Sequence, residues 1–259
     1  MQIIGCQTDI VWQDKPANHD RVRELLSSSP IEPGAMILLP EMFATGFSMH
    51  VDVIAEPVDG ETQTFLAELA KQLRSYVVGG VVTRAADGRG RNEAVVYDPD
   101  GRQVTRYCKL HPFSYAGETK YYQAGKTGAQ FTCHDFQVAP FVCYDLRFPE
   151  IFRRAVRHGA QLLAVIANWP QPRESHWLAL LRARAIENQA YVVGVNRAGS
   201  DPHARYGGHS LIVGPRGETL AEGDIGQELV RAEIELAPLL EYRAKFPALA
   251  DMRAEFFAE

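Results

Sequence analysis

The amino-acid sequence predicts an α/β protein, and three observations lead to that class. Short apolar runs rich in β-branched residues recur along the whole chain, as in buried strands. Segments with apolar residues three and four positions apart separate several of these runs, as in amphipathic helices. Two pairs of extended runs flank a Pro/Gly turn, which predicts hairpins. Strands that alternate with helices of this length are typical of βαβ units.

The predicted elements follow from these patterns in chain order. The strands are expected at 3–10, 36–40, 76–82, 92–98, 103–108, 138–143, 161–168, 190–196, 208–214 and 228–234. The helices are expected at 18–28, 61–73, 149–158 and 174–189, each with one apolar stripe. The hairpins are expected at "VVYDPDGRQVTRY" and "LIVGPRGETLAEG", where Pro and Gly favour the turn.

Length and composition favour one soluble domain. The chain has 259 residues, 46% hydrophobic and 23% charged, without a low-complexity tract or linker. We therefore expect a single domain over residues 1–259, with residues 237–259 as a partly helical C-terminal tail. The net charge of −5 argues against a general nucleic-acid binder. No apolar run reaches the roughly 20 residues that span a bilayer, which argues against a membrane protein.

The N-terminal sequence and the cysteines predict a cytoplasmic protein. The N-terminus "MQIIGCQTDIVWQD" has no basic region and no cleavage site of a signal peptide. The cysteines, with no regular spacing and no C-x-x-C, are Cys6, Cys108, Cys133 and Cys143. Neither a disulfide framework nor a cysteine zinc site is expected, and a reducing compartment suits such a chain. The eight histidines form no metal-binding motif either.

Polar or reactive residues come directly after the predicted strands. Glu41 follows 36–40, Lys109 follows 103–108, and Cys143 closes 138–143. Asn168 and Trp169 follow the apolar run "LLAVIA". Because ligands of α/β sheets bind outside the carboxyl ends of the strands, these side chains are expected to converge in one crevice.

The three residue types at these ends form a coherent chemical set. A carboxylate such as Glu41 can take the proton of the Cys143 thiol, which is a weak nucleophile until it ionises. An ammonium such as Lys109 can stabilise an oxyanion formed by attack on a carbonyl. Each residue also has an ordinary explanation: a buried cysteine spacer, a carboxylate that caps a loop, a solvated lysine. Three reactive types at three strand ends favour the chemical interpretation.

Three blocks of this sequence resemble the signatures of a known family. "LLPEMFATGF" around Glu41, "YCKLHPF" around Lys109 and "VCYDLRFPE" around Cys143 resemble the nitrilase (carbon–nitrogen hydrolase) superfamily, in the same order. "IANWP" and "ENQAYVVGVNRAG" are similar to further segments of that family. The resemblance implies a four-layer α-β-β-α sandwich, a homodimer formed across one helical layer, and a Glu-Lys-Cys triad. It implies neither a metal nor an organic cofactor.

The loop after Lys109 resembles one branch of this family in particular. "LHPFSYAGETKYYQAG" contains one acid, Glu118, which matches the second glutamate found in many members of the family. Its alternative is an exposed loop carboxylate. The stretch "GETKYYQAG" is similar to the bacterial omega-amidases, which remove the terminal amide of 2-oxoglutaramate and related 2-oxo-acid amides. The resemblance thus implies that Glu41 activates Cys143, that Lys109 and the backbone N–H of Tyr144 bind the oxyanion, and that Glu118 positions the amide nitrogen or the water.

Several alternatives remain open at this stage. The same machinery could act on an N-carbamoyl amine, another aliphatic amide or a nitrile, and a non-catalytic binding protein on this fold is a further possibility. Asn168 could line the pocket or brace it through backbone contacts, and Trp169 could form a wall of the pocket or pack in the core. Arg173 could hold a substrate carboxylate by a two-point contact or lie in solvent. Arg147 is expected to fix the turn after Cys143 in an ion-pair network with Asp145 and Glu150.

Overall fold

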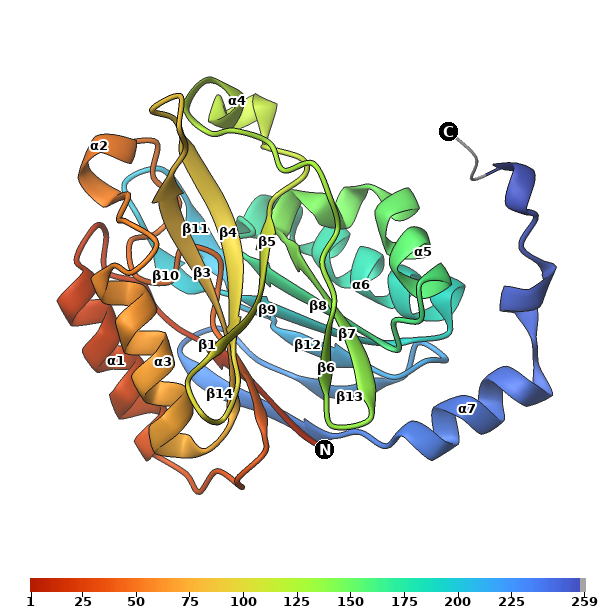
Figure 1. Ribbon diagram of the computed structural model, residues 1–259. Coiled ribbons are helices and arrows are strands. Elements are labelled where there is room, and N and C mark those ends of the chain that lie inside the picture. The colour runs from red at the N-terminus through yellow and green to blue at the C-terminus, as the bar shows by residue number, and fades with distance from the viewer. Residues whose placement is uncertain (257–259) are drawn as a thin grey trace.

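The structure, a computed structural model, describes residues 1–256 and contains two six-stranded mixed sheets packed face to face (Figure 1). The first sheet has the spatial order β14-β1-β2-β3-β4-β5, with bounds β1 (Gln2–Gln7), β2 (Met36–Leu38), β3 (Tyr76–Arg84), β4 (Gly90–Tyr97), β5 (Gln103–Cys108) and β14 (Glu228–Glu233). The second has the order β13-β12-β9-β8-β7-β6, with bounds β6 (Phe131–Cys133), β7 (Phe136–Val142), β8 (Leu162–Ala167), β9 (Tyr191–Asn196), β12 (Leu211–Val213) and β13 (Thr219–Glu222).

Helices cover the outer face of each sheet and complete the four layers (Figure 1). The first sheet is covered by α1 (Lys15–Ser27) and α3 (Glu61–Leu73), and the second by α5 (Pro149–Arg157) and α6 (Glu174–Asn188). The short helices α2 (Val51–Ile54) and α4 (Glu118–Tyr121) lie in loops, and a small ribbon pairs β10 (Ala198–Ser200) with β11 (Arg205–Gly207). The expected α-β-β-α sandwich is therefore confirmed.

Alternation along the strands explains how one sheet contacts two layers. In β1, Ile4 packs with the apolar stripes of α1 and α3, whereas Ile3 packs in the core between the sheets. In β2, Ile37 faces the helices, and Leu38 faces the second sheet. Because successive side chains point to opposite faces, a continuous apolar run buries both of them.

Both predicted hairpins are confirmed, while several strand ends differ from the expectation. The strand expected at 3–10 ends at Gln7, where pairing with β14 stops and the Gln7 amide donates to the carbonyls of Asp224 and Gly226. The strand expected at 36–40 is the shorter β2, and the one expected at 208–214 begins at Leu211. The sequence patterns also missed β6, β10 and β11, because three-residue strands are too short to show a period.

The C-terminal segment forms an arm beside the sandwich (Figure 1). It contains α7 (Leu236–Lys245) and two short turns, Ala248–Asp251 and Ala254–Phe256. Residues 257–259 of the expected tail lie outside the described residues. None of the helices within residues 1–256 is long and apolar enough to cross a membrane.

Strand direction brings the candidate residues to one end of the sandwich. β2 runs parallel to β3, β4 runs antiparallel to β3, and β5 runs antiparallel to β4. The carboxyl ends of β2 and β5 therefore point the same way, and Glu41 and Lys109 follow them. In the second sheet, β7, β8 and β9 are parallel, so Cys143 and Asn168 also share one end.

Candidate active site

The residue that directly follows β7 adopts an unusual backbone conformation. Cys143 has a φ of 48°, in the left-handed region that non-glycine residues rarely occupy, and it begins the 3-10 turn Cys143–Arg147 that leads into α5. Such a residue is strained by roughly 1–2 kcal/mol. The sharp change of direction points its thiol into a cavity of 370 Å³, whose wall also includes Lys109, Asn168 and Tyr144.

A buried ion cluster lies beside this thiol. The Lys109 ammonium is 2.9 Å from Glu41 Oε1, and it is 3.1 Å and 2.9 Å from the two carboxylate oxygens of Glu118. All three side chains are at most 1% exposed. The Asn92 amide joins the two carboxylates, because its nitrogen donates to Glu41 Oε1 at 2.6 Å and to Glu118 Oε1 at 3.0 Å.

Asn92 is a site residue that the sequence reasoning missed. It is a fully buried polar residue near the start of β4, directly before Glu93 and the apolar run that begins at Ala94. A signal was present, because Asn92 begins the run "NEAVVYD", and β4 starts at the end of the sheet where its antiparallel neighbours finish. A polar residue at the start of an antiparallel strand lies in the same crevice as the residues that follow the carboxyl ends of the neighbouring strands.

Charge and burial set the protonation states of the Cys143 thiol and the Lys109 ammonium. Burial by itself would lower the pKa of Lys109, but Glu118 and Glu41 raise it well above its ordinary value, so the ammonium stays charged. Burial and the Glu41 carboxylate raise the pKa of the Cys143 thiol well above its ordinary value, against the opposite effect of Lys109. The resting thiol is therefore protonated, and it contacts the Asn168 carbonyl at 3.9 Å. The Glu41 carboxylate, which raises the thiol pKa, is the group beside it that can accept its proton.

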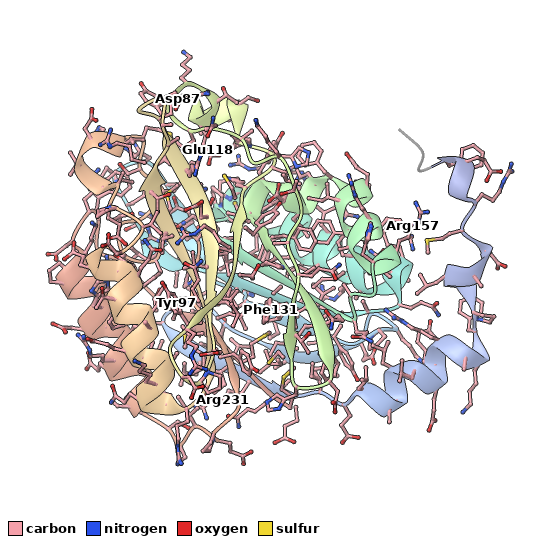
Figure 2. The ribbon with its side chains drawn as sticks, in the orientation of Figure 1. Asp87, Tyr97, Glu118, Phe131, Arg157 and Arg231 are labelled. Atoms are coloured by element: carbon pink, nitrogen blue, oxygen red, sulfur yellow. The ribbon has the colours of Figure 1, made fainter. Side chains whose placement is uncertain are left out.

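Glu118 is not the exposed loop carboxylate considered as an alternative. Its side chain is fully buried, and besides Lys109 and Asn92 it accepts a hydrogen bond from the backbone N–H of Phe113. Figure 2 shows it at the first residue of α4, near the end of the first sheet. Its hydrogen bonds thus go to protein groups that surround the ammonium.

Asn168 and Trp169 form part of the cavity wall. The backbone N–H of Asn168 donates to Glu41 Oε2 at 2.9 Å, which orients that carboxylate. Trp169 is 4% exposed, and its indole N–H donates to the Arg173 carbonyl at 2.7 Å. Asn196 supports this segment, because its side-chain oxygen accepts from the Trp169 backbone N–H at 2.7 Å.

Two arginines belong to the same wall, and one of them corrects an expectation. Arg173 lies over the Phe113 ring at 5.5 Å, within the cavity wall. Arg147 does not form the expected ion pairs with Asp145 and Glu150 within residues 1–256. It lies over the Trp169 ring at 4.8 Å and lines the cavity, because the 3-10 turn after Cys143 directs it there.

Loops distant in the sequence close the remaining sides. The Lys109 ammonium lies over the Phe47 ring at 5.2 Å from its centroid, and His203 and Tyr206 also line the cavity. These residues were not predicted, because Phe47 and His203 lie in loops and Tyr206 lies in the three-residue strand β11, and neither kind of segment carries a periodic signal. Within residues 1–256, no cluster of three or more His, Cys, Asp or Glu side chains has the arrangement of a metal site.

Because side chains alternate along a strand, the sequence predicts that the Cys108 thiol faces the core while Lys109 faces the crevice, and the structure differs from this prediction. Of the neighbouring residues Tyr107 and Cys108, it is Tyr107 that packs in the core between the sheets, at 1% exposure. The Cys108 thiol instead contacts the Gln123 carbonyl at 3.7 Å, in the segment that leads away from α4. Alternation does place Cys108 and Lys109 on different sides, but at the strand end the outer side is covered by a loop.

Cys143 is expected to be alkylated by iodoacetamide well before the other three cysteines. The thiols of Cys6 and Cys133 are fully buried, and desolvation raises the pKa of Cys133 and of Cys108 to about 12. Cys143 has its own raised pKa, but it alone opens on the cavity and has a carboxylate base beside it. Brief labelling near neutral pH followed by peptide mass mapping measures the order. Equal labelling of all four cysteines in the folded protein would contradict this assignment.

The fold and the site together define a class of protein. The site contains a protonated thiol beside a carboxylate and a buried ammonium, at the carboxyl ends of strands in both sheets. This arrangement suits a hydrolase that uses a cysteine nucleophile. The carbon–nitrogen hydrolase family model matches residues 4–244. The chain belongs to this family, within the nitrilase superfamily, and is an omega-amidase-like carbon–nitrogen hydrolase.

Known relatives cover nearly the whole chain. It is 33% identical to a 2-oxoglutaramate amidase of Bacillus subtilis, over 98% of each chain. It is 38% identical to the omega-amidase YafV of Escherichia coli K12, over 97% of this chain and 96% of the relative. A crystal structure of a CN-hydrolase superfamily protein from Xanthomonas campestris is 33% identical, covers 98% of this chain and 97% of its own, and gives a TM-score of 0.91.

Proposed function

We propose that this protein hydrolyses the terminal amide group of a short substrate that also carries a carboxylate, and that it releases the acid and ammonia. The leading candidate for the substrate is 2-oxoglutaramate. One observation carries this proposal: Arg147 and Arg173 both line the cavity that holds the Cys143 thiol. Within residues 1–256 neither guanidinium forms an ion pair with a carboxylate; Arg147 contacts His176 Nδ1 at 3.2 Å, and an acidic ligand would supply the missing carboxylate partner. The similarity to a 2-oxoglutaramate amidase supports the same choice.

The reaction begins with activation of the thiol. Glu41 takes the proton of Cys143, and the sulfur attacks the amide carbon while the carbonyl electrons move to the oxygen. The Lys109 ammonium and the backbone N–H of Tyr144 stabilise the resulting oxyanion. The protonated Glu41 then gives its proton to the nitrogen, the C–N bond breaks, ammonia leaves, and a thioester on Cys143 remains.

Water completes the cycle through the same carboxylate. Glu41 deprotonates a water molecule, the hydroxide attacks the thioester carbon, and the C–S bond breaks to release the acid. The sulfur recovers its proton from Glu41. Glu118 acts through Lys109, because its oxygens are occupied by Lys109, Asn92 and the Phe113 N–H. It keeps the ammonium at the position where the oxyanion forms.

A substrate panel tests the proposal. The kcat/KM is expected to be higher for 2-oxoglutaramate than for N-carbamoyl-β-alanine or an aliphatic nitrile. Arg147→Gln is expected to lower kcat/KM for 2-oxoglutaramate by about 10- to 100-fold, since a hydrogen bond to a charged group contributes about 1.5–3 kcal/mol. Hydrolysis of propionamide, which has no carboxylate, serves as the control and should change little. A clear preference for the carbamoyl compound or the nitrile would refute the choice of substrate and leave the family unchanged.

We also propose that residues 1–259 act as a single cytoplasmic domain, with residues 237–259 as a tail, and form a homodimer. The exposed apolar side chains Ile186 on α6 and Leu240 and Phe246 on the arm support a dimer that buries the helical layer. Light scattering coupled to size exclusion measures the mass, and a monomer at micromolar concentration would contradict the dimer.

A further inference from the structure

The Asp145 carboxylate is fully buried and joins two chain segments. Its Oδ2 accepts from the Tyr107 hydroxyl at 2.7 Å and from the Val142 backbone N–H at 3.1 Å. Its Oδ1 accepts from His111 twice, from the backbone N–H at 3.0 Å and from the ring Nδ1 at 2.9 Å. Because an ionised carboxylate only accepts, Nδ1 of His111 is the donor.

These hydrogen bonds connect the segments that carry the ammonium and the nucleophile. Val142 directly precedes Cys143, and His111 lies two residues after Lys109. Lys109 follows β5 of the first sheet, whereas Cys143 follows β7 of the second sheet. The carboxylate therefore spans the interface between the sheets at the point where the two reactive side chains must meet.

The His111 ring is held on its other side as well. It stacks on Phe148 with ring centroids 3.8 Å apart and an angle of 10° between the planes. Phe148 directly follows the turn Cys143–Arg147, and Asp145 lies within it. The His111 ring is therefore attached to this turn in two ways, by stacking on Phe148 and by the Nδ1 hydrogen bond to Asp145. The ring is 27% exposed, which places it at the edge of the site rather than in the core.

We propose that His111 is a positioning residue: through Asp145 it fixes the Lys109 ammonium relative to the Cys143 sulfur. This role rests on the Glu-Lys-Cys mechanism proposed above but not on the identity of the substrate. A displacement of about 1 Å between reacting groups can reduce a rate by about 100-fold, so an accurate connection between the two strand ends has a large effect on turnover.

Two substitutions separate the hydrogen bond from the stacking. His111→Asn keeps a donor near the position of Nδ1 and removes the aromatic ring. His111→Phe keeps the ring on Phe148 and removes the donor. His134→Phe is the matched control, because His134 also packs against an aromatic ring, Tyr76, and hydrogen-bonds a carbonyl, but it lies at the opposite end of β7.

The measurements are kcat and KM for an amide substrate, the rate of Cys143 alkylation, and Tm. His111→Phe is expected to lower kcat by about 10- to 100-fold with little change in KM, and to slow alkylation of Cys143. His111→Asn should stay close to the wild type in both rates, even if its Tm is lower. The proposal would be overturned if His111→Phe had the kcat and the alkylation rate of the wild type. It would also be overturned if both variants lost equal amounts of kcat and these losses matched their decreases in Tm.

The alkylation rate also separates this proposal from the proposed function. If the wild type fails to hydrolyse 2-oxoglutaramate while His111→Phe still slows alkylation and His111→Asn does not, the substrate is wrong and the positioning role stands. If the wild type is an active amidase and His111→Phe matches it in both rates, the positioning role is wrong and the function stands.

Discussion

Replacing Cys143 with Ala, Glu41 with Gln or Lys109 with Ala is expected to lower kcat by about 10⁴-fold or more, because residues that act as one unit lose most activity when any one is removed. Cys143→Ala removes only the nucleophile. Glu41→Gln removes the base, and its new amide group would meet either the Asn168 N–H or the Asn92 and Lys109 donors. Ammonia release measures turnover, and circular dichroism verifies that each variant is folded.

The three substitutions differ in their effect on stability. Lys109→Ala leaves Glu41 and Glu118 buried without their ammonium and is expected to reduce the free energy of unfolding by about 3–5 kcal/mol, as when a buried ion pair loses one partner. Cys143→Ala should cost much less. Cys108→Ala is the matched control for the loss of a thiol outside the cavity. A folded Glu41→Gln enzyme with near-normal turnover would rule out Glu41 as the base.

Glu118→Ala is expected to have the second largest effect, lowering both kcat and stability. Without Glu118, the buried ammonium loses one of its two carboxylates and Asn92 loses an acceptor, which should cost about 3–5 kcal/mol of unfolding free energy. The ammonium would move toward Glu41, away from the forming oxyanion, and a fall in kcat of about 100-fold is expected. Urea denaturation and steady-state kinetics measure the two effects.

The role of Glu118 can be separated from a contact with the substrate. If it acts through Lys109, kcat falls and KM changes little, whereas loss of a substrate contact raises KM. Glu68→Gln, an exposed carboxylate on α3, is the control and should leave both constants unchanged. Wild-type kcat in a folded Glu118→Ala enzyme would contradict the positioning of Lys109.

The fold class and the positions of three reactive residues could be predicted from sequence patterns. Apolar runs and helical spacing reflect burial, which acts on each element locally, so the α/β class, the hairpins and the main helices were found. Glu41, Lys109 and Cys143 were found because the carboxyl ends of parallel strands meet at one edge. Their catalytic roles stay predictions, and the four-layer arrangement came from the family resemblance rather than from periodicity.

Only the tertiary structure decided which side chains meet. Asn92 joins Glu41 and Glu118, residues that are 51 and 26 positions away, and no local pattern encodes such contacts. Arg147 was expected in an ion-pair network and instead lines the cavity, because the left-handed backbone at Cys143 redirects the turn.

The protonation state of the Cys143 thiol also depended on the tertiary structure. The sequence alone determined that a thiol, a carboxylate and an ammonium occur at strand ends, but not the direction of the thiol pKa, because Glu41 and Lys109 oppose each other. Burial and Glu41 outweigh Lys109 in the folded protein and raise that pKa. Desolvation and charge separation depend on three-dimensional distances, which arise only when the two sheets pack together.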